Sequence, residues 1–493
     1  MEALSFQQAI QQSIQSANLV PILPEIFLSV LAMVLLLITV FSPGGQKSYL
    51  GYISFIGIVA TGVLVGAGWG GHIESFSGSV VLDNFATFFK MIFLVAAGLT
   101  VLMADQYMER ENCNHGELYP LILFTVVGMM LMASGTDLMT IFLGLEVMSV
   151  SLYVLAGFNR ASVKSNEAGL KYFLLGAFST GFLLYGMALT YGATGTTRIA
   201  KIAVQVGQMS LPSANIMLLA GMLLMLTGFA FKIAAAPFHM WTPDVYEGAP
   251  TPITAFMSAG PKAAGFAAAL RIFLVALPTM QVEWSQLLWV LAVLTMTVGN
   301  ITALRQDNIK RMLAYSSIAH AGYALVGFVA GNGTGTAGIL FYMLSYAFMN
   351  IGAFAIVILV GKKGETNGTV QDFAGFGTRH PVLAVAMTIF LFSLAGMPPT
   401  AGFIGKFYLF SGAIQKGYVW LAIIGVLNSA ASVYYYLRVM VFMYMKDSTE
   451  EFDWMQVTAP MALCVAIAVA GSLIPGIIPS LILQFAQQAV RLI

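Results

Sequence analysis

The sequence carries little charge. Asp, Glu, Lys and Arg together make up 9% of the 493 residues, whereas hydrophobic residues make up 59%. A soluble domain has about 25% charged residues, so this composition excludes a water-soluble globular protein. We therefore expect the chain to lie in a lipid bilayer.

Cysteine and clustered basic residues are also scarce. Cys113 and Cys464 are far apart, and neither belongs to a CxxC pair. This spacing predicts neither a disulfide framework nor a zinc or iron–sulfur site, so we expect no metal or redox cofactor on this chain. The formal net charge is +1 and the Lys and Arg residues are scattered, which excludes nucleic acid as a partner.

Long hydrophobic runs fill most of the chain. A hydrocarbon core about 30 Å thick requires roughly 20 apolar residues per helix, and by this measure the sequence has about fourteen candidate segments. None alternates polar and apolar residues as a lipid-facing barrel strand would, so we expect an all-α integral membrane protein. The segments lie near residues 22–41, 51–68, 84–104, 118–134, 136–157, 167–191, 213–236, 252–277, 284–304, 311–330, 336–360, 381–413, 418–443 and 457–485.

These segments predict one membrane domain over residues 1–493. Within it, residues 1–117 would form three N-terminal helices and residues 118–277 a first group of five. Residues 284–443 would form a second group of five, and residues 457–493 a C-terminal helix.

Two segments are too long to be straight spans. Residues 213–248 and 381–415 each run about 35 positions, which as a helix would reach roughly 50 Å. The run from Ala234 to Pro237 interrupts the first and the run from Gly396 to Gly402 interrupts the second, because proline removes a backbone donor and glycine frees the dihedrals. Broken helices five segments apart predict two five-helix repeats, inverted because five is odd. Such paired breaks indicate an ion pathway.

Basic residues concentrate in the loops that follow odd-numbered segments, and Arg160, Lys164, Lys310 and Arg311 are examples. By the positive-inside rule these loops face the cytoplasm. Both termini are therefore expected on the non-cytoplasmic side of the membrane.

Four ionisable residues, Glu146, Lys232, Lys262 and Lys406, lie near the middle of apolar segments. A lysine at the bilayer centre costs about 2.5–3.5 kcal/mol, so these groups must face one another, a cavity or internal water. Burial disfavours the charged form of each group and a nearby opposite charge restores it, so Glu146 would decide whether Lys232 holds a proton. A proton pump requires such a switch. The alternative is a set of static ion pairs that fix helix register, although three lysines exceed one carboxylate.

Several other polar residues have two interpretations. Lys171 lies about one turn into its segment and could either reach the interface or belong to a proton path. His320 could relay protons or be a packed polar residue, and His239 favours helix-end hydrogen bonding over a relay role. Asp244 and Glu247 favour capping of the broken helix over acid catalysis.

The stretch from Phe231 to Pro252, FKIAAAPFHMWTPDVYEGAPTP, resembles the signature of the antiporter-like membrane subunits of complex I, the proton-pumping NADH:quinone oxidoreductase. Leu145-Glu146, Lys262, residues 310–318 (KRMLAYSSI) and residues 396–407 (GMPPTAGFIGKF) support the resemblance. Within that family the chain most resembles the N-type subunits. The M type has glutamate at the position of Lys406, and the L type adds a lateral helix.

The resemblance implies roles for the buried residues. Glu146 and Lys232 would form a modulating pair, Lys262 and the histidines would relay protons along a hydrated axis, and Lys406 would be the terminal donor. The chain would be a multi-pass subunit of a bacterial cytoplasmic membrane, driven by quinone reduction in partner membrane subunits. FMN, iron–sulfur clusters and quinone would belong to those partners. A cation/proton antiporter subunit shares the fold and most motifs, and a passive scaffold subunit is a further alternative.

Overall fold

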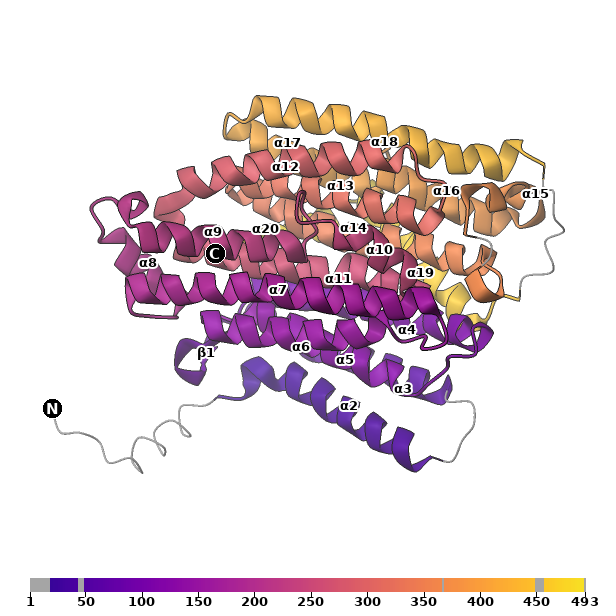
Figure 1. Ribbon diagram of the computed structural model, residues 1–493, viewed down its shortest axis with the longest axis horizontal. Coiled ribbons are helices and arrows are strands. Elements are labelled where there is room, and N and C mark those ends of the chain that lie inside the picture. The colour runs from indigo at the N-terminus through magenta and orange to yellow at the C-terminus, as the bar shows by residue number, and fades with distance from the viewer. Residues whose placement is uncertain (1–17, 43–47, 366–367, 448–455, 492–493) are drawn as a thin grey trace.

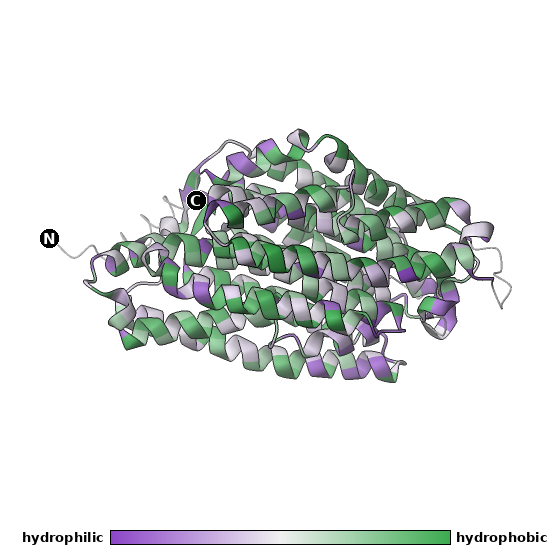
Figure 2. Ribbon diagram, turned by 90° about the horizontal axis from the view of Figure 1, so that it is seen from above, coloured by the Kyte–Doolittle hydropathy of each residue, from purple (hydrophilic) through white to green (hydrophobic). Residues whose placement is uncertain are grey.

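The computed structural model describes four stretches of the chain, residues 18–42, 48–365, 368–447 and 456–491. Its helices run side by side along one common direction (Figure 1). Eleven described helices are long and apolar enough to cross a membrane, and three shorter apolar helices accompany them. Hydrophobic residues predominate along the helices (Figure 2). The prediction of a helical membrane protein is confirmed.

The N-terminal part contains two long helices, a small β hairpin and a third long helix. The hairpin corrects the all-α prediction: β1 pairs antiparallel with β2, with Glu74 opposite Val81. A tight turn joins these strands, and Gly78 in it adopts a φ of 81°, which glycine tolerates without steric cost. The elements are η1 (Val20–Ile22), α2 (Leu23–Phe41), α3 (Ser48–Ala67), β1 (Ile73–Ser75), η2 (Phe76–Gly78), β2 (Val80–Leu82) and α4 (Asn84–Arg110).

The next part contains the first broken helix. Side-chain oxygens cap the N-termini of several of its helices. Asp137, Ser162 and Asn215 each accept a hydrogen bond from a backbone N–H of the first turn. The elements are α5 (Leu118–Ser134), α6 (Leu138–Ala156), α7 (Val163–Thr194), α8 (Ile199–Gly207), η3 (Pro212–Ala214), α9 (Ile216–Lys232), α10 (Trp241–Gly248), α11 (Thr251–Leu270) and the π-helical η4 (Arg271–Ala276).

The following part contains the second broken helix. Asn308 and Asn332 cap the starts of α13 and α14 in the same way. The elements are η5 (Pro278–Met280), α12 (Gln281–Ala303), α13 (Ile309–Ala330), α14 (Gly333–Val360), η6 (Lys363–Glu365), η7 (Val370–Phe373), α15 (Phe376–Arg379), α16 (Pro381–Ala395), α17 (Ala401–Gln415) and α18 (Val419–Met445).

The last predicted segment, residues 457–485, is not one helix. It divides into α19 (Ala459–Ile477) and α20 (Ser480–Val490). Pro475 and Pro479 explain the division, because each lacks the backbone N–H that would continue the helix. The chain termini at residues 1–17 and 492–493, whose side of the membrane was predicted, lie outside the described residues.

Both predicted helix breaks are confirmed. Residues 233–240 separate α9 from α10, and residues 396–400 separate α16 from α17. Ala234 and Gly396 both adopt left-handed φ values, 61° and 85°. Lys232 is the last residue of α9, whereas Lys406 lies in the second turn of α17, so the two lysines occupy opposite sides of their breaks.

Four helices form the interior. In α4, α11, α13 and α14, 89–94% of the most apolar stretch is buried, against 33–56% in the other long candidate spans. Small residues allow neighbouring helices to approach closely. A Cβ added to Gly144 of α6 would lie 2.8 Å from the carbonyl oxygen of Gly128 in α5. The interior helices thus hold Lys262 and His320 away from lipid.

Candidate functional site

Lys232 ends α9 inside the protein. Its Nζ donates to the Ser149 hydroxyl on α6 at 2.8 Å, and this hydroxyl donates in turn to the carbonyl of Leu145. The Tyr153 ring centroid lies 5.8 Å from the same Nζ. The predicted buried position of Lys232 is therefore confirmed, with a serine as its hydrogen-bond partner.

Glu146 lies on α6, one turn before Ser149. Ser149 bonds the Lys232 Nζ, but Glu146 and Lys232 form no ion pair in the described part of the chain. One carboxylate oxygen, Oε1, is buried and has no hydrogen-bond partner among the described residues. The two groups are thus neighbours that are not locked together.

Lys262 lies in the middle of α11. Its Nζ donates to the carbonyl and to the hydroxyl of Ser317 on α13, at 2.8 and 2.5 Å. The Tyr246 ring centroid is 5.9 Å away. A Cβ added to Gly265, one turn further along α11, would contact the side chain of Lys232, so α11 brings the Lys262 region close to the first break.

His320 lies on α13 between two tyrosine hydroxyls. Nδ1 is 2.6 Å from the hydroxyl of Tyr342 and Nε2 is 3.0 Å from the hydroxyl of Tyr436. The Tyr436 hydroxyl also bonds the Ser316 hydroxyl. Along α13, His320 lies between Ser317, which Lys262 contacts, and Tyr323, whose ring centroid is 4.6 Å from the Lys406 Nζ.

Lys406 is held at the second break. Its Nζ donates to the carbonyls of Leu394 and Ala395, at 3.0 and 2.9 Å, and to the hydroxyl of Ser429 at 2.9 Å. The two carbonyls belong to the last turn of α16. The Tyr323 ring centroid is 4.6 Å from Nζ.

Lys171 lies apart from these buried groups. Its side chain is 40% exposed and pairs with Glu167 at 2.7 Å and with Asp244 at 2.8 Å. His239 is half-buried in the first break, and its Nδ1 has no hydrogen-bond partner among the described residues. The structure therefore does not bring Lys171 or His239 into hydrogen-bond contact with Lys232, Lys262 or Lys406.

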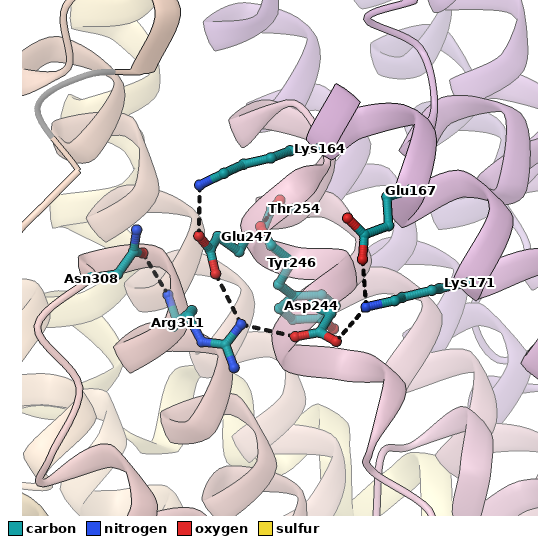
Figure 3. A network of polar contacts seen from close by, with 9 residues as sticks. All are labelled: Lys164, Glu167, Lys171, Asp244, Tyr246, Glu247, Thr254, Asn308 and Arg311. Atoms are coloured by element: carbon teal, nitrogen blue, oxygen red, sulfur yellow. Dashed lines mark hydrogen bonds and ion pairs between the residues drawn. The ribbon is translucent and has the colours of Figure 1, made fainter. Parts of the chain in front are cut away.

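Asp244 and Glu247 belong to an ion-pair network rather than capping a helix (Figure 3). The Arg311 guanidinium joins Asp244 to Glu247, with both contacts at 2.9 Å, while Lys164 also pairs with Glu247 at 3.0 Å. The predicted capping role is wrong because α10 begins at Trp241, with no side-chain cap at Met240. The network connects α7, α10 and α13.

The hydroxyl partners of the buried bases were not predicted. They are Ser149, Ser317, Tyr342, Tyr436 and Ser429. Ser317 lies inside the motif of residues 310–318, three positions before His320. Residues at this spacing share one face of a helix, so the sequence could have indicated Ser317 as a polar neighbour of the row. The other partners lie on other helices, 22 to 116 positions away in the sequence.

The four buried bases share one chemical property. Lys232, Lys262, His320 and Lys406 are each 2–5% exposed, and each hydrogen-bonds hydroxyl groups rather than a carboxylate. Hydroxyl groups donate and accept hydrogen bonds. Such partners can serve both the protonated and the neutral form of a base.

The family described as NADH:quinone oxidoreductase/Mrp antiporter, TM, matches residues 135–432. A Trichlorobacter lovleyi protein named NADH-quinone oxidoreductase subunit N is 75% identical over 98% of this chain and 99% of its own length. The Chloroflexus aggregans protein of the same name is 46% identical over 91% of this chain and 92% of its own length.

Solved structures agree with this assignment. A chain of respiratory complex I from Thermus thermophilus with bound Aureothin is 33% identical, with a TM-score of 0.80 over 94% of this chain and 99% of that chain. A chain of the Mrp complex from Dietzia sp. has a TM-score of 0.81 at 20% identity, over 96% of this chain and 97% of that chain, and so shares the fold. The chain belongs to the family of NADH-quinone oxidoreductase subunit N, among the antiporter-like membrane subunits of complex I.

Proposed function

We propose that this chain is a proton-translocating membrane subunit of a respiratory NADH:quinone oxidoreductase. The proton would move along a row of side chains formed by Glu146, Lys232, Lys262, His320 and Lys406. One observation carries the proposal: the four buried bases of this row contact hydroxyls and carbonyls, with no carboxylate within ion-pair distance in the described part of the chain. This arrangement favours proton exchange over static pairing.

Ion pairs elsewhere in the molecule provide the contrast. Lys90 pairs with Glu25 at 2.6 Å and Arg271 pairs with Asp83 at 3.0 Å, and all four side chains are at most 5% exposed. Direct pairing stabilises the charged form of both partners. These two buried basic groups are therefore paired directly with a carboxylate, whereas the bases of the row have neutral partners.

Coupling in this proposal starts at Glu146 and Lys232. Charge movement in the quinone-bearing partner subunits would change the separation of these two groups, and so the proton affinity of Lys232. Since one oxygen of Glu146 has no hydrogen-bond partner among the described residues, that carboxylate is not fixed by a bond that would resist the change. A proton released by Lys232 would pass to Lys262.

The remaining steps would use hydroxyl groups. Lys262 contacts Ser317, and the adjacent Ser316 bonds Tyr436, which bonds His320. Lys406 would receive the proton last. The carbonyls at the C-terminal end of α16 stabilise its ammonium, because that end of a helix carries partial negative charge.

Two cavities adjoin the charged network of Figure 3. One, of about 160 Å³, is lined by residues that include Glu247, Thr251 and Lys310, and a second, of about 180 Å³, by residues that include Lys171 and Asp244. Charged cavity walls favour water. We assign this end of the molecule as the side from which protons approach Lys262.

The proposal includes a finer topology. The eleven candidate spans and three shorter apolar helices would make fourteen membrane crossings in one membrane domain, with inverted repeats over residues 118–277 and 284–443. Both termini would lie on the non-cytoplasmic side of a bacterial cytoplasmic membrane. This topology would place the network of Figure 3 at the cytoplasmic end.

The partners in this proposal are other membrane subunits of complex I, both antiporter-like and quinone-binding. FMN, iron–sulfur clusters and quinone would lie in the partners, and this chain would carry out no redox chemistry of its own. Any metal site of the complex would likewise lie in those partner subunits.

A cation/proton antiporter subunit is the alternative, and the shared fold with the Mrp complex supports it. The 75% identity to a protein named subunit N favours the oxidoreductase. Purification of the chain from native membranes separates the two alternatives. Flavin- and iron–sulfur-containing partners are expected, and a stable complex without them would support the antiporter.

Tyr436→Phe tests the row itself. The variant removes the hydroxyl between Ser316 and His320, so proton pumping by the assembled complex should slow by about tenfold, as expected for one lost hydrogen bond of about 1.4 kcal/mol. Tyr444→Phe is the control on the same helix, α18, since the Tyr444 hydroxyl lies 3.1 Å from the Thr388 hydroxyl and outside the row. Equal pumping by both variants and the parent would contradict the route through His320.

A further inference from the structure

Arg271 and Asp83 form a buried ion pair at the end of α11 that lies beside the β hairpin. Arg271 begins η4 directly after α11, and Asp83 follows β2 and caps the start of α4. The guanidinium Nη1 and Nη2 donate to the two carboxylate oxygens at 3.0 and 3.1 Å. The proposed proton row uses neither residue.

Further contacts hold the pair in place. Arg271 Nε donates to the carbonyl of Ala133 at the end of α5, at 3.0 Å, and the Phe85 ring centroid lies 4.8 Å from the guanidinium carbon. Asp83 Oδ1 also accepts the backbone N–H of Ala86 at 2.7 Å. One side chain therefore joins the ends of α4, α5 and α11.

An apolar stretch separates this pair from Lys262. Arg271 is nine positions after Lys262, which along a helix is roughly 13–14 Å. The intervening residues of α11, Ala263 to Leu270, are Ala, Gly, Phe and Leu, and all are buried. Their side chains offer a proton no hydroxyl, amide or carboxyl group.

The surrounding backbone closes the same end. Thr136, just after α5, donates its N–H to the carbonyl of Ser79 between the hairpin strands. The short helix α8 packs against η4, with Ile199, Ile202 and Val206 buried beneath it. Four cavities among the described residues are lined by neither Arg271 nor Asp83.

A guanidinium in this position blocks protons for two reasons. It has no acceptor atom and stays protonated, so it cannot relay a proton. It also donates to both oxygens of the Asp83 carboxylate, so a proton would have to displace the guanidinium to reach that group. The paired carboxylate keeps this cation in place without leaving a net buried charge.

We propose that the Asp83–Arg271 pair, together with the apolar stretch from Ala263 to Leu270, forms a proton seal at the hairpin end of the first half of the chain. A proton on Lys262 then cannot escape toward the hairpin and passes to His320. This inference rests on the proposed function, because a seal beside Lys262 matters only if Lys262 carries a proton.

Passive proton permeability tests the seal. The assembled complex is reconstituted in liposomes without NADH, a potassium diffusion potential is imposed, and proton uptake is followed with an internal pH dye. Arg271→Met should raise uptake several-fold above the parent, because it removes the fixed cation and leaves Asp83 free to be protonated. Lys90→Met is the matched control, since it breaks an equally buried pair whose lysine lies on α4, the helix that Asp83 caps, and it should stay as tight as the parent.

Two double variants complete the test. The first combines Arg271→Met with Lys262→Met. Proton uptake should return to the parental level, because the leak would pass through Lys262. A leak that persists in this double variant would overturn the claim that the seal confines a proton on Lys262. Where Arg271→Met fails to assemble, Asp83→Asn with Arg271→Gln keeps a neutral hydrogen-bonded contact and should leak in the same way. A tight assembled variant lacking the Arg271 cation would overturn the seal.

The proposed function is judged by a separate readout. Lys262→Met should lose NADH-driven pumping whether or not the seal exists. If that variant pumps and Arg271→Met is tight, both proposals fail. If Lys262→Met does not pump and Arg271→Met is tight, only the seal fails.

Discussion

At the scale of single residues, serine hydroxyls hold the buried ammonium groups. Ser149, Ser317 and Ser429 each contact one lysine of the row. A hydroxyl can donate to a neutral amine or accept from an ammonium, whereas a carboxylate within 3 Å would favour the ammonium strongly. The choice of partner therefore keeps both protonation states of the lysine accessible.

Ser149→Ala tests this role. It removes the hydrogen-bond partner of Lys232, and a hydrogen bond to a charged group contributes about 1.5–3 kcal/mol. We expect NADH-driven proton pumping to fall by roughly tenfold or more, measured in liposomes with the assembled complex.

Ser151→Ala is the matched control for that change. Ser151 is also buried on α6, two residues further along, and its hydroxyl does not contact Lys232 in the structure. We expect parental pumping from this variant. A Ser149→Ala variant that also pumps at the parental rate would show that the hydroxyl has no part in the transfer.

At the scale of helices, the broken spans follow directly from residue chemistry. The proline and glycine residues near positions 237 and 396–402 predict both breaks, and the structure has them there. The depth of Lys232, Lys262 and Lys406 could also be predicted, because each lies within an apolar run.

The partners of those lysines could not be predicted in the same way. Most of these helices are apolar around their whole circumference, so the sequence does not define which side of a helix faces a given neighbour. Lys232 meets a serine 83 positions away and Arg271 meets an aspartate 188 positions away. Such contacts depend on how whole helices are arranged.

Close packing of α5 against α6 gives a prediction for stability. Gly144→Ala places a methyl group within 2.8 Å of the carbonyl oxygen of Gly128, and overpacking of this kind costs about 1–3 kcal/mol. We expect a lower thermal unfolding temperature for the purified complex. Gly181→Ala is the control, because its Cβ meets nothing within 4 Å; an equal effect of both variants would contradict the packing argument.

The ion-pair network of Figure 3 gives a contrasting prediction. The side chains of Asp244 and Lys171 are each 40% exposed, and exposed pairs contribute about 0–1 kcal/mol. Asp244→Asn should therefore assemble and pump at close to the parental rate. A loss of pumping as large as that of a Lys232 variant would place Asp244 and Lys171 in the proton path.

At the scale of the whole molecule, the bases of the proposed proton row lie in the interior, each 2–5% exposed. The row begins beside α6 and α9, crosses α11 and α13, and ends at the second break beside α17. The row reaches from one broken helix to the other, because the first supplies Lys232 and the second supplies Lys406. In the proposed function, this row is a lateral route for protons between the two broken helices.

The account depends most on Lys232 and Glu146, and one measurement tests them directly. The ratio of protons pumped to NADH oxidised is measured in liposomes that contain the assembled complex with Lys232→Met or Glu146→Gln. We predict a ratio well below the parental value at a normal assembly level, because the switch that starts the transfer is lost. A parental ratio in both variants would contradict the central claim.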